Sequence, residues 1–162
     1  MERLLIALDC MPGCRRIIEY LARVLKGSTN CGFVLFHILP TVSPDKLRMD
    51  AVQRIERIHV ARPDLGGYFW KEDDERNMDK TFVQARKILT DAGFPDEVIT
   101  TYFAVESGDL ADIILRTAAE LDCSSIILGR RRISRMKQLL LGRVSGSTLR
   151  LAKGAAVWVI EC

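Results

Sequence analysis

The sequence predicts a single α/β domain, residues 1–162, built on one doubly wound, mostly parallel five-stranded sheet with helices on both faces. Short, nearly continuous apolar runs alternate with amphipathic helical stretches along the chain. Such runs are typical of strands that are covered on both faces, and strand–helix alternation with short links is typical of parallel crossover units. A length of 162 residues is normal for one domain with a buried core.

The first strand, the first helix and the second strand are the clearest elements. The run RLLIALD predicts a buried strand over residues 3–9, and CGFVLFHIL predicts another over residues 31–39. Between them, apolar residues recur at helical spacing from Ile17 to Leu25, and Gly27 lies where a helix C-terminal cap belongs. This order of elements predicts a parallel pair of strands joined by a helix.

The alternation resumes after one irregular segment. Residues 41–68 carry several prolines and glycines and predict at most a short helix at 46–58. The elements expected after this segment are a helix at about 70–92, a strand at 98–106, a helix within 108–122, a strand at 124–129, a helix at about 143–152 and a strand at 155–161.

Composition narrows the class of protein. Nearly half of the residues are hydrophobic and 28% are charged, which is a globular composition, and the net charge of +3 is too small to indicate nucleic-acid binding by itself. No apolar run approaches the roughly 20 residues of a membrane-spanning helix, and the start of the chain lacks the apolar core of a signal peptide. We therefore expect a cytoplasmic protein. The five cysteines form no zinc-like cluster, so we expect reduced thiols without a metal.

The carboxyl ends of the strands are where a doubly wound sheet binds its ligand, and Asp9, Ile38 and Gly129 are expected at three such ends. Gly129 would let a ligand approach the backbone closely, because glycine has no Cβ. Residues 142–145 open a helix, whose free amides attract anions, and Ser145 adds a hydroxyl donor. These features predict either a phosphate cradle or an ordinary strand–loop–helix connection with turn glycines.

Nearly the whole chain resembles the universal stress protein family. The segments that carry the resemblance are LLIALD, LFHIL, ESGDLADIILRTAAEL and IILGRRRISRMKQLLLGRVSGSTLRLAKGAAVWVIE. The last is the most specific, because the nucleotide binders of the family have Gly-x2-Gly-x9-Gly-Ser/Thr there. The resemblance implies an adenine nucleotide alpha hydrolase-like, Rossmann-like fold that typically forms a homodimer, often through its last strands. It also implies binding of ATP, with Mg²⁺, or membership of the group that binds no nucleotide.

The resemblance further implies which residues bind the nucleotide. In the binders, the aspartate of the first strand contacts the ribose or base region, and the end of the second strand flanks the base. The glycine motif supplies amides and a hydroxyl to the phosphates. On this sequence, the implied nucleotide-binding residues are Ala7, Leu8, Asp9, Ile38, Leu128, Gly129, Arg132, Gly142, Arg143, Val144 and Ser145.

Two positions depart from the glycine motif of the family. Arg132 replaces its second glycine, and a Cβ there could block a backbone conformation that the binders use. Arg143 replaces the serine or threonine, so that the amide stays but the hydroxyl is lost. The turn after Asp9 also lacks the usual glycine-serine. Because arginine suits phosphate through its planar donor fork, the two arginines either favour a more anionic ligand or fill the site and abolish binding.

Two alternatives to nucleotide binding remain open. The arginines from Arg130 to Arg135 form a cationic cluster of the kind that nucleic-acid phosphates require, but no aromatic residues for base stacking are interleaved with them. The apolar last strand, from Ala155 to Ile160, predicts a homodimer through an exposed sheet edge. The other alternative is therefore a dimer that binds no nucleotide and acts through protein partners.

We do not expect an enzyme. His37 lies in the apolar run FVLFHIL and is expected to be a packed strand residue rather than a base. No Ser–His–acid spacing and no metal-ligand cluster appears. Asp9 could activate water or hold Mg²⁺ beside a triphosphate, but no second catalytic group is evident, so any ATP hydrolysis should be slow.

Overall fold

Five parallel strands form the central sheet of the computed structural model, which describes residues 1–9, 14–130 and 142–161. The sheet has the order β5-β2-β1-β6-β7, and every pair of neighbours is parallel. The predicted doubly wound α/β fold is therefore confirmed. The strands are β1 (Glu2–Ala7), β2 (Cys31–Leu39), β5 (Ile99–Val105), β6 (Ser125–Arg130) and β7 (Ala156–Glu161).

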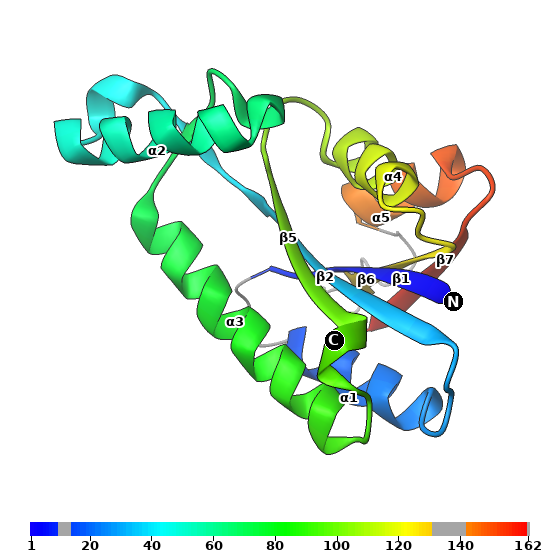
Figure 1. Cartoon of the computed structure of the whole chain (residues 1–162). Coiled ribbons are helices and arrows are strands. Elements are labelled where there is room, and N and C mark those ends of the chain that lie inside the picture. The colour runs from blue at the N-terminus through cyan, green and yellow to red at the C-terminus, as the bar shows by residue number, and fades with distance from the viewer. Residues whose placement is uncertain (10–13, 131–141, 162) are drawn as a thin grey trace.

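Four helices cover the two faces of the sheet (Figure 1). On one face lie α1 (Cys14–Val24) and α3 (Glu72–Asp91), and on the other lie α4 (Leu110–Glu120) and α5 (Arg143–Leu151). Alternate residues of β1 pack into the two layers: Leu4 and Ile6 toward α1 and α3, and Leu5 toward α4. No helix in the described part of the chain is both long and apolar enough to cross a membrane.

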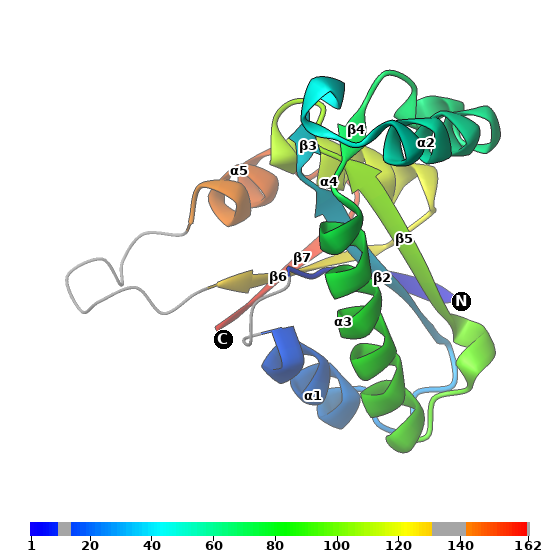
Figure 2. The same ribbon diagram turned by 90° about the vertical axis from the view of Figure 1, so that its left-hand side faces the viewer.

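Residues 41–68, for which the sequence predicted little regular structure, belong to a small packed unit beyond the carboxyl end of β5 (Figure 2). Its helix begins and ends later than the predicted 46–58, since residues 44–46 form a separate short turn before it. Ile55 of this helix is buried in a cluster with Leu39 and Trp70. The unit consists of β3 (Thr41–Val42), η1 (Pro44–Lys46), α2 (Met49–Ala61), η2 (Pro63–Leu65) and β4 (Phe69–Trp70), and a further turn, η3 (Asp96–Val98), precedes β5. The strands β3 and β4 form an antiparallel pair.

One carboxylate of α3 joins two elements of this unit, α2 and β4, to the main layer. Glu75 Oε2, on α3, accepts a hydrogen bond from Trp70 Nε1 at 3.0 Å and one from Arg54 Nη2 at 2.9 Å. Trp70 is fully buried, and its ring meets the ring of Phe103 edge-to-face. Since a buried indole N–H needs an acceptor, Glu75 fixes where β4 and α2 rest on α3.

Two side chains hold the carboxyl end of β1 in place. His37 Nδ1, on β2, donates to the Leu8 carbonyl oxygen at 2.7 Å, so its tautomer is set with the hydrogen on Nδ1. The Cys14 sulfur, at the start of α1, accepts the Asp9 N–H at 3.1 Å and lies 2.8 Å from the Asp9 carbonyl oxygen and 3.0 Å from Oδ1. The thiol has one hydrogen, which either oxygen can accept. These contacts tie β1 to β2 and to α1 where the strand ends.

Removing the Glu75 carboxylate should destabilise the fold. In Glu75→Ala, the Trp70 N–H and the Arg54 guanidinium lose their acceptor, and we expect a loss of about 1–3 kcal/mol in the free energy of unfolding. Urea unfolding followed by tryptophan fluorescence measures it. The control is Glu19→Ala, which removes an exposed i,i+4 pair with Arg15 and should cost about 0.5 kcal/mol or less. Equal losses in the two variants would contradict the role of Glu75.

The imidazole of His37 should make stability depend on pH. Burial lowers the pKa of His37 below its ordinary value of 6.5, against the opposing effects of the Leu8 hydrogen bond, Asp9 and Asp74. As pH falls below about 6.5, the unfolded chain binds the proton first. The contribution of neutral His37 is therefore complete above that pH and is lost as pH falls through the lower, folded pKa. We expect urea midpoints at pH 7.5 and 5.5 to differ more for the wild type than for His37→Gln. Identical pH dependence would contradict this.

Candidate functional site

A cavity of about 500 Å³ opens at the carboxyl ends of β1, β2 and β6. The chain leaves β1 for one face of the sheet and enters β6 from the other, so the strand order reverses between these neighbours. A doubly wound sheet binds its ligands in the crevice at such a switch point. The cavity is lined by Ala7, Leu8, Asp9, Ile38, Leu128, Gly129, Gly142, Arg143, Val144 and Ser145, which are all the predicted site residues in the described part of the chain. Arg132 lies outside the described residues. Whether these residues bind a ligand stays a prediction.

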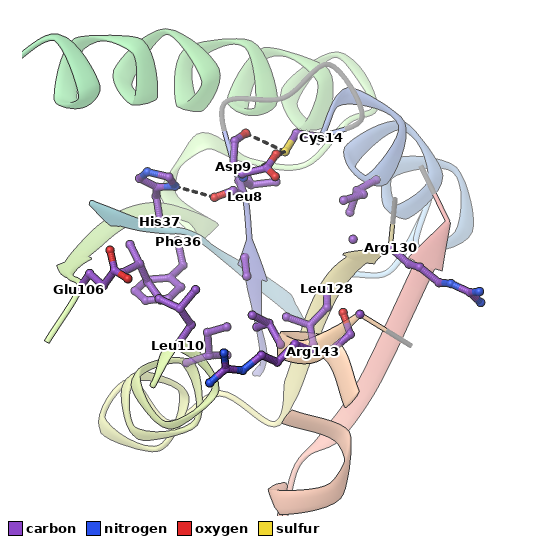
Figure 3. Close-up of a pocket in the computed structure, with 18 of the residues that line it drawn as sticks. Leu8, Asp9, Cys14, Phe36, His37, Glu106, Leu110, Leu128, Arg130 and Arg143 are labelled. Atoms are coloured by element: carbon purple, nitrogen blue, oxygen red, sulfur yellow. Dashed lines mark hydrogen bonds between the residues drawn. The ribbon is translucent and has the colours of Figure 1, made fainter. Parts of the chain in front are cut away.

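The middle of the cavity is apolar. Phe36, Leu110 and Leu128 line it from β2, α4 and β6 (Figure 3). Ile38 and Ile114 are further apolar residues of the lining. Pockets for small organic ligands are typically walled by such side chains, with a few polar groups that fix orientation. The apolar centre can therefore take a planar ring, while the polar groups lie toward the rim.

Three helices begin at this cavity, and each points its amino-terminal end toward it. Cys14 opens α1, Leu110 opens α4 and Arg143 opens α5, and all three residues line the cavity. The first amides of a helix lack intrahelical partners and carry the positive end of the helix dipole. Their convergence favours an anionic group at the rim.

The start of α5 offers the most open of these ends. Its N-cap is Gly142, which has no side chain to accept from the first-turn amides. A Cβ at Gly142 would meet no atom of the described residues within 4 Å, and its φ of −55° suits any residue. Ser145 is only 6% exposed, and its hydroxyl makes no hydrogen bond within the described chain. Among the described residues, neither the packing nor the backbone requires a glycine at this position.

The carboxylate of Asp9 lies on the opposite side of the cavity from Arg143 (Figure 3). Asp9 is half-buried, and Oδ1 lies within hydrogen-bond distance of the Cys14 sulfur. Cys14 also lines the cavity and contacts Asp9, a position that the sequence analysis did not predict for any cysteine. Cys14, Cys31 and Cys123 are free thiols, and Cys10 and Cys162 lie outside the described residues.

His37 and Glu106 also line the cavity, although the sequence analysis did not place them there. His37 does belong to a strand, as expected, but it is only partly buried, and its lowered pKa keeps the ring neutral near neutral pH. Since Nδ1 carries the hydrogen, Nε2 is an acceptor. Glu106 directly follows β5, so the strand-end argument that pointed to Asp9 and Ile38 would also have found it, had it been applied to the third strand.

Of the arginines from Arg130 to Arg135, only Arg130 belongs to the described residues. Arg130 lies at the end of β6 and at the cavity, but its side chain extends away from the centre of the cavity (Figure 3). The rest of the run, including Arg135, lies outside the described residues, so the nucleic-acid alternative stays a prediction. Within residues 1–9, 14–130 and 142–161, no three His, Cys, Asp or Glu side chains gather as metal ligands would.

Solved structures of similar shape include several universal stress proteins. One from Archaeoglobus fulgidus has a TM-score of 0.66 at 17% identity and covers 98% of this chain and 93% of its own. A universal stress protein solved in complex with cAMP has a TM-score of 0.65 at 16% identity, with 98% and 96% covered. The Archaeoglobus fulgidus protein in complex with dAMP has a TM-score of 0.62 at 17% identity, with 98% and 97% covered. At these identities, the likeness shows the fold alone.

Comparison with a sequence model of a protein family assigns the chain to a family, which structural similarity at low identity does not. No curated protein sequence matches the chain. The model of the universal stress protein family, however, matches residues 1–160, which is almost the whole chain. The resemblance seen in the sequence motifs is thereby confirmed: the chain belongs to the universal stress protein family.

Proposed function

We propose that this protein binds ATP or a related adenine nucleotide in the cavity between β1 and β6. The observation that carries the proposal is that residues from four separate segments, which the family resemblance implied as nucleotide-binding, line one cavity at the switch point of the sheet. The phosphates would lie on the first-turn amides of α5, the base in the apolar centre near Ile38, and the ribose beside Asp9.

The chemistry of the lining supports this orientation. Asp9 is an acceptor for ribose hydroxyls, and Gly142, Val144 and Ser145 present donors to phosphate. Two relatives of the same fold are solved with cAMP and with dAMP, which makes an adenine nucleotide the first ligand to test on this chain. No acidic cluster forms a metal cage in the described chain, so Mg²⁺ would enter bound to the triphosphate rather than to a preformed set of carboxylates.

We propose a binding protein with a regulatory role rather than an enzyme. His37 and Asp9 lie on the side of the cavity opposite Arg143, away from the proposed phosphate end (Figure 3). General-base catalysis of hydrolysis needs a base within hydrogen-bond reach of the attacking water at the phosphate. The absence of catalysis, the cytoplasmic location and a role in stress response stay predictions.

We also propose that two copies pair through the outer edge of β7. Among the described strands, β7 pairs only with β6, and its central residues are only partly buried. Trp158 packs on the layer of α1 and α3, whereas Val157 packs on the layer of α4 and α5. The neighbouring helix α5 exposes Leu149 and Leu151. An unpaired edge flanked by apolar side chains favours pairing with a second copy.

The other edge of the sheet is less available for pairing. Arg62 Nη2 donates to the Phe103 carbonyl oxygen of β5 at 3.1 Å and is held by Asp64 at 2.7 Å. Its guanidinium also stacks on the ring of Tyr102, 4.6 Å from the centroid. Because Arg62 occupies a backbone acceptor of β5, we place the dimer interface on β7. If no nucleotide binds, this dimer, acting through protein partners, is the second candidate function.

Isothermal titration with ATP and Mg²⁺ at two salt concentrations tests the nucleotide site. We expect saturable binding by the wild type and a loss of roughly 10-fold or more in affinity for Asp9→Ala, since a hydrogen bond to a charged group contributes about 1.5–3 kcal/mol. Asp79→Ala, an exposed change on α3, should bind as the wild type does.

If millimolar ATP gives no heat of binding and does not raise the melting temperature, nucleotide binding is refuted. The dimer is then the function to pursue. A single-stranded oligonucleotide is titrated in parallel. Tighter binding of the oligonucleotide than of ATP, falling steeply with salt, would move the assignment to nucleic acid.

Light scattering at micromolar concentration tests the dimer. The Ala156 N–H points at Ser124 of β6, so by alternation the N–H of Val159 points to the open edge. Val159→Pro removes that donor without touching the ladder to β6, and we expect a monomer. Val159→Thr keeps the N–H and should stay dimeric. A monomeric wild type, or a dimeric Val159→Pro, would rule out this interface.

A further inference from the structure

Arg143 occupies the position at which the family's nucleotide binders carry serine or threonine, and here it is the first residue of α5. It lines the cavity, yet 91% of its side chain is exposed. The amides that follow it in the first turn are those that Gly142 leaves uncapped. A phosphate on these amides would therefore lie within the reach of the guanidinium of the same turn. Serine at this position would offer one hydroxyl, whereas arginine offers a full positive charge and a planar donor fork.

Among the described residues, one carboxylate forms an ion pair with that guanidinium. Arg143 Nη2 lies 3.9 Å from Asp109 Oδ2, and the side chain extends along the rim toward Leu110 (Figure 3). Asp109 is also the N-cap of α4: its Oδ1 accepts the Ala111 N–H at 2.9 Å. The carboxylate is thus held in position by the helix that it caps, while the arginine is free to turn about its own side-chain bonds.

The pairing of Arg143 with Asp109 is weak. Both side chains are well exposed, at 91% and 42%, and the distance is at the limit of an ion pair. Exposed pairs of this kind contribute about 0.2–1 kcal/mol. A phosphate group carries more charge than a carboxylate and accepts the guanidinium fork in two parallel hydrogen bonds. A phosphate bound at the start of α5 would therefore displace Asp109 as the partner of the Arg143 guanidinium.

We propose that Arg143 is a ligand of the outer phosphates and that Asp109 holds its guanidinium at the rim until a phosphate displaces it. The inference rests on the proposed nucleotide site. It makes Arg143 the residue that favours nucleotides with more phosphates, because a monophosphate engages the helix amides but presents little further charge. It also assigns Asp109 a second role besides capping α4, as the competitor that weakens triphosphate binding.

Titration of AMP, ADP and ATP against a set of variants tests the proposal. In Arg143→Ser, which restores the family residue, we expect ATP affinity to fall roughly tenfold and AMP affinity by less than about twofold. Arg150→Ser is the matched control: Arg150 is an exposed arginine in the last turn of the same helix. It should leave the ratio of ATP to AMP affinity unchanged. Equal changes in the two variants, or equal losses for AMP and ATP, would overturn the role of Arg143.

Asp109→Asn isolates the competing carboxylate, because asparagine keeps an oxygen that can cap α4. We expect ATP affinity to rise by roughly two- to fivefold, which corresponds to the free energy of an exposed ion pair. The double variant Asp109→Asn with Arg143→Ser separates competition from plain repulsion. If Asp109 acts by holding Arg143, the gain disappears in the double variant; if the gain persists, Asp109 merely repels phosphate and the holding contact is disproved.

The wild type distinguishes failure of this inference from failure of the proposed function. Wild-type protein that binds none of AMP, ADP and ATP at millimolar concentration overturns both. Wild-type protein that binds all three, with Arg143→Ser changing none of the ratios, leaves the nucleotide site standing and overturns only the role of Arg143.

Discussion

The position of β1 at the centre of the sheet is the constraint on which the ligand end of this protein depends. β1 pairs with β2 on one side and β6 on the other, and its two faces are buried under different helix layers. A strand held in this way ends where its neighbours end, so Asp9, Ile38 and Gly129 meet at one edge although they are far apart in the chain. The crossovers also return each helix to that edge, which is why α1, α4 and α5 all begin there. The cavity follows from the topology before any ligand is considered.

Much of this architecture could be predicted because its signals are local. Buried runs such as LLIALD report a strand covered on both faces, and the strand-end rule then locates the site. The packed unit of residues 41–71 escaped prediction because Ile55, Leu65 and Trp70 are buried by contacts with Leu39 and Val105, which are distant in sequence. Side-chain roles escaped for a similar reason. Nothing in the run FVLFHIL indicates that His37 donates to Leu8, and nothing in the spacing from Asp9 to Cys14 indicates a thiol on the aspartate.

Membership of the universal stress protein family and the departures from its motif bear on different questions. Membership accounts for the sheet order and for the place of the cavity. The departures bear on which ligand the proposed site would favour. Arg143 stands on a helix start whose geometry is otherwise undisturbed, and it adds charge without adding bulk to the cavity, because its side chain lies along the rim. Under the proposed function, a change of this kind would alter preference among ligands more readily than it would abolish binding.

The unequal edges of the sheet bear on the size of any assembly. A sheet with two unpaired edge strands can pair with another copy at each edge. Every copy that is added then presents a further unpaired edge, so the assembly grows into an open-ended ribbon. Here the Arg62 guanidinium occupies the Phe103 carbonyl oxygen on the β5 edge, whereas in the described part of the chain no side chain is seen to bond the outer backbone of residues 156–160 in β7. Growth through a single available edge stops as soon as two copies have met. In the proposed dimer, Arg62 would therefore help to keep the β5 edge from pairing with a further copy.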